Sequence, residues 1–373
     1  MTIEYNTLEV EIDLSAIRHN YRILCEKGTK VYGVIKADAY GHGLIEVADA
    51  LSKEGADTFA VGTVNEAVEL RKSGRGERII ALLGLLNETD CFNAVKYNVI
   101  PFIGEFEQLE MLSSVVSAQG QKIEISLKFD TGMSRLGFSV DELDQLIDWL
   151  KANPQISPVL TSSHLATSDD PAYEDYVGAQ ADQFSHILKE LESAGFELEA
   201  SLANSAGILV HDKVRLMAQR AGIALYGANP LSGTKWNEIG GRLIPAMQVS
   251  TKIASVHTLK KGRSISYGCT YTAEKDMTVA IVCAGYADGY SRSLSNTGQV
   301  CINGKRAKIV GRVCMQLTAV DVTDIPDVSF GGRAYLLGGE GEGKISPDDL
   351  AGWWETITYE VFCLLGQNPK TFK

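Results

Sequence analysis

Lys36 is the residue of this chain whose surroundings most strongly suggest covalent chemistry. It follows residues 31–35, an apolar and β-branched run typical of a buried strand, and it opens the segment Lys-Ala-Asp-Ala-Tyr-Gly-His-Gly. An ammonium group at the end of a buried strand loses hydration, so it needs a partner carboxylate, for which Asp38 is available. Alternatively, these surroundings make the amine nucleophilic at neutral pH, so that it can form a Schiff base. The residues alone leave both interpretations open.

The alternation of apolar and amphipathic segments in the first 230 residues indicates the elements that would position this lysine. Apolar strand candidates alternate with amphipathic helical patterns, and eight strand–helix units predict a TIM-like (β/α)8 barrel in an α/β protein. A doubly wound sheet is the alternative, but no GxGxxG follows the first strand and the count of eight fits closure. The predicted strands lie near residues 31–35, 57–61, 79–84, 98–103, 123–129, 159–164, 198–203 and 222–226.

Polar side chains stand where several of these predicted strands end. In a barrel, the carboxyl ends of the strands form the rim on which reactive groups gather. A single histidine or asparagine there is more often a satisfied structural hydrogen bonder, but several around one rim predict a pocket. The rim candidates are Lys36, Lys128 with Arg135, His164, Asn204 with Ser205, and Arg220 just before the eighth strand.

The second part of the chain has a different pattern. Residues 229–242 are rich in Gly, Pro, Ser and Asn and read as a linker, after which short strand candidates follow one another with turns. We therefore predict a barrel domain over 1–240, which includes an amino-terminal strand at 8–14 and the linker, and a β-rich domain over 241–373 that ends in a helical pattern at 347–365.

The bulk composition excludes several classes of function. A net charge of −12 over 373 residues argues against nucleic acid or an anionic membrane as partner. No apolar run approaches the roughly 20 residues of a membrane span, and the amino terminus lacks the apolar region of a signal peptide. Seven cysteines without a CxxC pair favour free thiols in a reducing cytoplasm, and no metal site is expected.

The segment that follows the first predicted strand resembles the pyridoxal phosphate (PLP) lysine motif of alanine racemases. At least four further motifs follow in order, among them ANSAG, GIALYG, SYG and GYADGY, so the resemblance covers nearly the whole chain. It implies a PLP-dependent amino-acid racemase that supplies D-alanine for peptidoglycan, with PLP held on Lys36 as a Schiff base. It also implies a homodimer with shared active sites.

The same resemblance assigns cofactor-binding residues. Arg220 would donate to the pyridine nitrogen, and because arginine keeps its proton, the ring would stay a weak electron sink, which suits racemisation. Without the motif, a rim salt bridge would be the simpler interpretation of Arg220. His164 matches a histidine that supports the cofactor. The residues implied at the phosphate are Tyr40, Asn204, Ser205, Gly222, Ile223 and Tyr359.

Racemisation needs an acid and a base on opposite faces of one carbon atom. By resemblance to the SYG motif, Tyr267 is the second base and removes the α-proton of the L-isomer, while Lys36 serves the D-isomer. Arg135 is suited to bind the substrate carboxylate as a fork. The family implies that Lys128 is often carbamylated, with a plain lysine as the alternative. Two further residues are implied at the substrate: Tyr286, which lines its entry, and Met315, whose backbone N–H binds its carboxylate.

Gln316 departs from the family pattern, which usually has aspartate there. The change removes one negative charge beside the site and supplies an amide. Racemases of this superfamily that accept serine resemble the chain in having an amide there, so some acceptance of serine beside alanine is expected. Two rivals are a barrel-type PLP decarboxylase, which places an acidic group at the pyridine nitrogen instead of Arg220, and a non-catalytic PLP carrier. The β-rich half that bears Tyr267 argues against the carrier.

Overall fold

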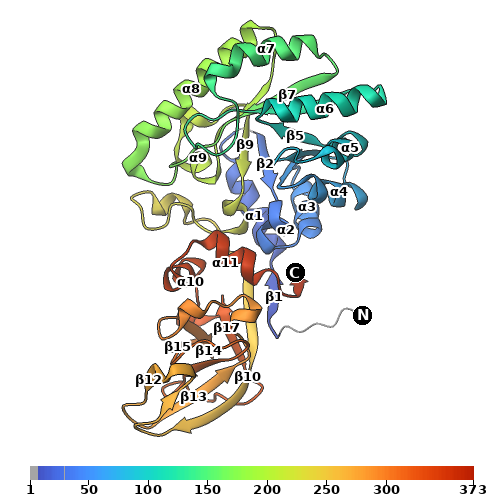
Figure 1. Ribbon diagram of the computed structural model, residues 1–373. Helices are drawn as coiled ribbons and strands as arrows, with labels where there is room; N and C mark the ends of the chain where they lie inside the picture. The colour runs from blue at the N-terminus through green and yellow to red at the C-terminus, as the bar shows by residue number, and fades with distance from the viewer. Residues whose placement is uncertain (1–6, 29) are drawn as a thin grey trace. The chain divides into compact units, whose positions relative to one another are not determined.

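The computed structural model describes residues 7–28 and 30–373, which divide into two compact units (Figure 1). One unit comprises Ile17–Ala39 and Leu44–Leu243. The other joins the amino-terminal stretch up to Ala16, the short piece Tyr40–Gly43 and the segment Ile244–Lys373. Each is described by itself below. None of the helices in the described residues is long and apolar enough to cross a membrane.

The larger unit is a closed barrel of eight parallel strands, as predicted (Figure 1). The last strand pairs with the first, Tyr32 lying opposite Arg220, so the sheet has no free edge. The central positions of most strands are fully buried, as parallel strands covered by helices require. The strands are β2 (Lys30–Val34), β3 (Thr58–Val61), β4 (Arg78–Ala81), β5 (Ile100–Ile103), β6 (Ile123–Lys128), β7 (Ile156–Ser162), β8 (Glu199–Ser201) and β9 (Ala218–Ala221).

One helix precedes the first barrel strand and the others connect the strands, and several of them are amphipathic. In α7, for example, Leu143, Leu146, Ile147 and Leu150 recur at helical spacing and are buried, while the opposite face is polar. The helices are α1 (Leu14–Cys25), α2 (Lys36–Gly41), α3 (Leu44–Ser52), α4 (Val64–Lys72), α5 (Glu88–Lys96), α6 (Phe106–Gln119), α7 (Leu143–Ala152), α8 (Glu174–Ser193) and α9 (Ser205–Val210).

The predicted position of the eighth strand was wrong. The strand is β9, Ala218–Ala221, so Arg220 lies within it, and the apolar run Ile223–Tyr226 forms a 3-10 turn. The chain leaves the extended conformation at Gly222, whose ψ is −98°. The Ser205 hydroxyl accepts the backbone N–H groups of Gly222 and Ala224, which replaces the hydrogen bonds of a strand. Since the run is buried in either conformation, its hydrophobicity did not distinguish strand from turn.

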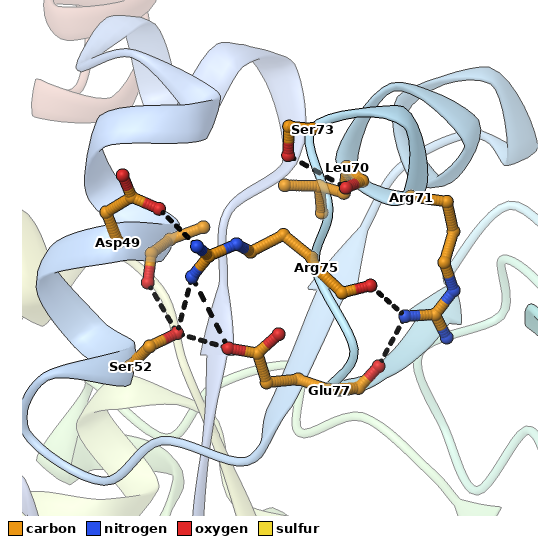
Figure 2. A network of polar contacts seen from close by, with 8 residues as sticks. Asp49, Ser52, Leu70, Arg71, Ser73, Arg75 and Glu77 are labelled. Atoms are coloured by element: carbon orange, nitrogen blue, oxygen red, sulfur yellow. Dashed lines mark hydrogen bonds and ion pairs between the residues drawn. The ribbon is translucent and has the colours of Figure 1, made fainter.

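A polar network fixes the loop that enters β4, at the rim opposite the carboxyl ends of the strands (Figure 2). Arg75 pairs with Asp49 of α3 at 2.9 Å and with Glu77 at 3.5 Å. Arg71, near the end of α4, donates to the backbone carbonyls of Arg75 and Glu77, and it also reaches two carbonyls that precede β5. The network joins helices to strands and carries no feature of a reactive site.

The smaller unit is β-rich, as predicted, and its main sheet has the order β15-β14-β17-β10-β1-β18, while β13 pairs with β10 and β16 pairs with β13. The separate strands β11 and β12 form a two-stranded ribbon. The strands are β1 (Glu9–Ile12), β10 (Met247–Leu259), β11 (Ser264–Ile265), β12 (Tyr271–Thr272), β13 (Met277–Val282), β14 (Gln299–Ile302), β15 (Lys305–Lys308), β16 (Thr318–Asp321), β17 (Arg333–Leu337) and β18 (Lys370–Phe372).

Strand β1 lies outside the barrel, as its alternating pattern predicted, because it pairs with β10 and β18. The prediction had nevertheless counted this strand with the domain 1–240, whereas the compact units divide at Leu243 and Ile244 and place it in the smaller one. The predicted helix at 347–365 is two helices, α10 (Pro347–Trp354) and α11 (Thr358–Leu365). They are separated at Glu355, which has a left-handed φ of 60°.

Candidate active site

Lys36 stands at the start of a left-handed helical turn. The next four residues, Ala37 to Tyr40, have φ values of 52°, 53°, 54° and 55°. Left-handed backbone costs L-residues about 1–2 kcal/mol each, so the turn stores roughly 4–8 kcal/mol. A backbone hydrogen bond of 2.9 Å from Ala39 to Ile35 closes it. Such strain persists only where the surroundings determine the conformation. The surrounding structure therefore fixes the direction of the Lys36 side chain.

Two carboxylates brace this turn from within the barrel unit. Glu66 of α4 accepts the N–H of Ala37 at 2.7 Å, and Asp38 accepts the N–H of Leu44, the first residue of α3, also at 2.7 Å. The Asp38 carboxylate therefore caps a helix, whatever other contacts it makes. Glu66 had no place in the sequence prediction, and only its position three residues after Thr63, as in a capping box, marked it.

Arg220 is buried inside the barrel and donates to neutral acceptors. One terminal nitrogen, Nη1, bonds the carbonyl of Ser201 at 2.7 Å and its hydroxyl at 2.8 Å. The other, Nη2, bonds the carbonyl of Ser163, the carbonyl of Leu202 at 3.3 Å, and Nδ1 of His164 at 3.3 Å. Burial lowers the pKa of Arg220 to about 10, which leaves it charged at neutral pH. The structure thus fixes a charged guanidinium among neutral hydrogen-bond acceptors.

Four basic residues act electrostatically on His164. Burial, and then Arg220, Lys128, Arg135 and Lys36, hold the pKa of His164 well below its ordinary value. The imidazole is therefore neutral. Because Nδ1 faces an N–H donor of Arg220, it is the acceptor, and Nε2 carries the hydrogen. The hydrogen bond between Arg220 and His164 brings together two rim residues that were predicted from separate strands.

Lys128 is a buried lysine whose charge is disfavoured. Its Nζ donates to the backbone carbonyl of Phe129 at 2.6 Å. Burial, reinforced by Arg220 and Arg135 and opposed by Asp130, lowers the pKa of Lys128 to about 7. A large fraction of this amine is consequently unprotonated and nucleophilic at neutral pH.

The two segments predicted to bind phosphate lie side by side. Asn204 caps α9 by accepting the N–H of Gly207 at 3.0 Å. Ser205 accepts the N–H groups of Gly222 at 3.0 Å and Ala224 at 3.3 Å. These bonds bring Ser205, Gly222 and Ile223 together and leave the hydroxyl hydrogen of Ser205 for an acceptor. The arrangement offers donors to an anion.

The smaller unit carries the remaining predicted residues. The rings of Tyr40 and Tyr359 lie with their centroids 5.9 Å apart. Burial, with Tyr359 and Cys363 nearby, raises the pKa of Tyr40, so its hydroxyl stays a donor. Tyr267 stands on a 3-10 turn, Tyr267–Cys269, between β11 and β12, and 71% of it is exposed. It follows Ser266, which has a φ of 67° and donates to the carbonyl of Arg312 at 2.6 Å.

Tyr286 and Met315 are held together by backbone contacts. Tyr286 donates to the carbonyl of Cys314 at 3.1 Å, and Ala287 donates to that of Met315 at 2.9 Å. A methyl group on Gly285 would lie 2.2 Å from the Cys314 carbonyl, so only glycine allows this approach. Tyr286 and Met315 are both exposed, at 45% and 58%.

Gln316 is bonded to a carboxyl that the sequence prediction missed. Its side chain bonds Asp288, which is buried and also accepts the N–H of Gly285 at 3.0 Å. Burial raises the pKa of Asp288, and these two donors limit the rise. The predicted loss of charge at position 316 therefore means that one buried carboxyl stands beside an amide rather than beside a second carboxyl. The segment Gly-Tyr-Ala-Asp-Gly-Tyr held this aspartate, but no pattern linked it to Gln316.

The comparisons with known proteins identify the family. Models described as the N-terminal and C-terminal domains of alanine racemase match residues 12–230 and 246–372. The chain belongs to the alanine racemase family. It is 51% identical, over 373 residues that cover all of both chains, to an alanine racemase of Nitratidesulfovibrio vulgaris strain Miyazaki F. The resemblance stated from the sequence is confirmed, and members of this family are PLP-dependent isomerases.

Solved alanine racemases have the same fold. The enzyme from D-cycloserine-producing Streptomyces lavendulae superimposes with a TM-score of 0.91 at 30% identity, over 99% of this chain and 97% of that chain. The enzyme from Bartonella henselae, solved with covalently bound pyridoxal phosphate, gives 0.88 at 28% identity, over 98% and 99%.

The residues of this racemase fit PLP. A buried guanidinium that keeps its proton suits a ring nitrogen that accepts a hydrogen bond. The Ser205 hydroxyl suits a phosphate, because its oxygen accepts the N–H groups of Gly222 and Ala224 and its hydrogen can be donated to an anion. The left-handed turn carries Lys36, whose charge is among those that lower the pKa of His164. The barrel unit therefore holds, by itself, donors for both ends of the cofactor and the lysine that would bind it.

Proposed function

We propose that this racemase interconverts L- and D-alanine with two bases, Lys36 and Tyr267. Family membership supports the reaction, and one observation supports the choice of lysine. Lys36 is the cation that follows the first barrel strand on a strained left-handed turn, and it acts electrostatically on His164 beside Arg220. The alternatives of a decarboxylase and a carrier do not account for Arg220 together with the second domain.

We further propose how the chain holds its cofactor. Lys36 binds PLP covalently, and Arg220 donates to the pyridine nitrogen without protonating it. His164, kept neutral by burial and by its cationic neighbours, supports the ring. When bound, PLP withdraws electrons from the α-carbon of the attached amino acid and so acidifies its α-proton. The phosphate would be bound by Asn204, Ser205, Gly222 and Ile223 and by the hydroxyls of Tyr40 and Tyr359.

The proton transfers need one group on each face of the α-carbon. Lys36 Nζ takes or returns the proton of the D-isomer, and the Tyr267 hydroxyl takes or returns that of the L-isomer. Both atoms must be shielded from water to act on such a weak acid. Since Tyr267 is 71% exposed and Tyr286 and Met315 are exposed on the same unit, we propose that a second copy of the chain covers them. The homodimer would then share its active sites.

The substrate carboxylate would be bound by Arg135 and by the backbone N–H of Met315, with Tyr286 lining the entry. Arg135 lies close enough to Lys128 to lower its pKa. We propose that the neutral amine of Lys128 forms an N–C bond to carbon dioxide and releases one proton to solvent, since the carbamate formed is an anion that would attract and orient Arg135.

We propose some turnover of serine beside alanine, because Gln316 can donate to a hydroxyl and brings no second negative charge next to Asp288. The racemase would supply D-alanine for peptidoglycan, as expected of this family. The substrate preference can be measured by coupled turnover of L-alanine and L-serine on one preparation.

The two-base assignment is tested by exchange of the α-hydrogen in deuterated water. In Tyr267→Phe, racemisation should fall by about 10²–10⁴-fold, the usual worth of a general base. D-alanine should still exchange its α-hydrogen through Lys36, whereas L-alanine should not. Equal exchange of both isomers in this variant would show that Tyr267 is not the base for the L-isomer.

A further inference from the structure

Glu66 makes contacts that an ordinary helix cap would not need. As the third residue of α4 it forms a capping box with Thr63: its N–H bonds the Thr63 hydroxyl at 3.2 Å, and Oε2 accepts the N–H groups of Gly62 at 2.7 Å and Thr63 at 2.9 Å. These bonds complete the helix end. The second oxygen, Oε1, instead accepts the N–H of Ala37 at 2.7 Å. One carboxylate thus joins the start of α4 to the residue that follows Lys36.

The surroundings leave little room for these groups to shift. A methyl group on Gly62 would lie 2.9 Å from Oε2 of Glu66 and 3.6 Å from Cβ of Lys36. Below the turn, the N–H of Ile35 bonds the carbonyl of Ala60 at 2.9 Å, which continues the pairing of β2 with β3. Strand β3 therefore fixes the chain before Lys36, and Glu66, from the helix that follows β3, fixes it after Lys36.

We infer that Glu66 is a positioning residue for Lys36: its carboxylate holds the left-handed turn that aims the lysine. Ala37, at a φ of 52°, is the first residue of the turn and has a Cβ that disfavours this conformation. An acceptor on its N–H opposes the return to right-handed backbone. The inference rests on Lys36 being the PLP lysine, as proposed above.

A carboxylate suits this place better than an amide. The Ala37 N–H and the N–H groups at 62 and 63 approach opposite oxygens, and carboxylate oxygens only accept. Glutamine is an accepted third residue of a capping box, so Glu66→Gln can keep α4 capped with its single oxygen. Its NH2 group would then face the N–H of Ala37. The substitution removes the contact with the turn while it preserves the helix end.

The test compares Glu66→Gln with two control variants of the PLP-loaded enzyme. Thr63→Ala removes the hydroxyl that caps α4 but leaves the Glu66 carboxylate in place. Glu142→Gln makes the same chemical change in another capping box, where Glu142 accepts the N–H and hydroxyl of Ser139. The measurements are kcat and KM for alanine, the pH dependence of the visible absorbance of lysine-bound PLP, and the rate of PLP loss on dialysis.

In Glu66→Gln, kcat should fall about 10- to 100-fold, as expected for misplacement of a reacting group by about 1 Å, and PLP should dissociate faster. The pH at which the absorbance of lysine-bound PLP changes should shift, because the Lys36 nitrogen would have a different position relative to the groups around it. Thr63→Ala and Glu142→Gln should keep kcat within twofold. If Glu66→Gln yields no folded protein, Glu66→Asp is measured instead. The shorter aspartate side chain cannot reach both the N–H of Ala37 and the N–H groups at 62 and 63, so the same fall in kcat and the same faster loss of PLP are expected.

A double variant distinguishes a change in the orientation of Lys36 from a defect in folding. Glycine adopts positive φ without cost, so Ala37→Gly added to Glu66→Gln should restore kcat at least partly and return the absorbance toward that of the wild type. An unchanged kcat and absorbance in Glu66→Gln, an equal loss in Thr63→Ala, or no rescue by glycine would overturn the inference. The wild type and Lys36→Ala are measured first. If lysine-bound PLP absorbs equally in both, the assignment of Lys36 fails instead.

Discussion

Lys128 should make the stability of the enzyme depend on pH, and Lys128→Met should remove that dependence. The lysine is 9% exposed, and burial, Arg220 and Arg135 lower its pKa from 10.5 to about 7. In the unfolded chain the amine is protonated up to about pH 10.5, whereas in the folded chain it is protonated only below about pH 7. Between these values the unfolded state binds the extra proton, so stability rises with pH.

The magnitude follows from the shift. At 1.36 kcal/mol per unit, a fall of 3.5 units, from 10.5 to about 7, destabilises the fold by about 5 kcal/mol when the pH is well below 7. At pH 7, Lys128 is neutral in about half of the folded molecules, and the destabilisation caused by its protonation decreases as the pH rises. Integrating from pH 7 to pH 9 gives a gain in unfolding free energy of about 2 kcal/mol in the wild type, over and above that of Lys128→Met.

The assay is urea unfolding of both proteins at pH 7 and pH 9 in buffer free of carbon dioxide. The difference between the two proteins isolates Lys128 from every other titrating group. Bicarbonate should flatten the extra slope of the wild type, because a carbamate replaces the amine that would titrate, and should leave Lys128→Met unchanged. If the unfolding free energies of the two proteins change equally with pH in the absence of carbon dioxide, the reasoning about the burial of Lys128 is refuted. If bicarbonate does not alter the pH dependence of the wild type, carbamylation of Lys128 is refuted.

Three other substitutions have definite expected outcomes. Arg71→Met should lower the unfolding free energy by about 3 kcal/mol in urea, because four backbone carbonyls lose a charged donor, while kcat stays unchanged; a loss of kcat at full stability would contradict this structural role. Gln316→Asp should place a second carboxyl beside Asp288, so the pH of half-unfolding should shift and the serine-to-alanine ratio of kcat/KM should fall; an unchanged ratio would refute the role of the amide. Gly41→Ala should lower Tm by several °C, since its methyl group would lie 2.5 Å from the carbonyl of Phe362 and its φ is +79°; a wild-type Tm would show that the backbone can move apart there.

The barrel was predictable because its signal is periodic. Apolar runs of strand length alternated with amphipathic helices, and each of the first seven predicted strands overlaps an observed one. The eighth was misplaced because Ile223–Tyr226 is as apolar as a strand, while the true strand contains Arg220 and Gln219. A polar side chain that points into a barrel looks, in sequence, like the end of a strand. Functional residues placed there obscure the pattern that locates the element.

The tertiary contacts that orient the side chains of the site could not be predicted from periodicity. Nothing in the segment after Lys36 indicates a left-handed turn, because Ala37 and Ala39 favour right-handed helix when considered alone. The conformation depends on Glu66, 29 residues away. The bond between Gln316 and Asp288 likewise joins two turns that no short motif connects. Sequence motifs identified the reacting groups, and tertiary contacts supplied their direction.

The local charge of the site explains why overall composition said little about the substrate. The chain carries a net charge of −12, yet Lys36, Lys128, Arg135 and Arg220 all act electrostatically on one neutral histidine. Burial, and then the like charges of Arg220 and Arg135, lower the pKa of Lys128, so protonation of this lysine destabilises the fold. An anionic ligand relieves that repulsion and binds only the folded state, so it must stabilise the protein. The phosphate of PLP and the carboxylate of an amino acid both meet this requirement, which links the chemistry of the site to the stability of the barrel.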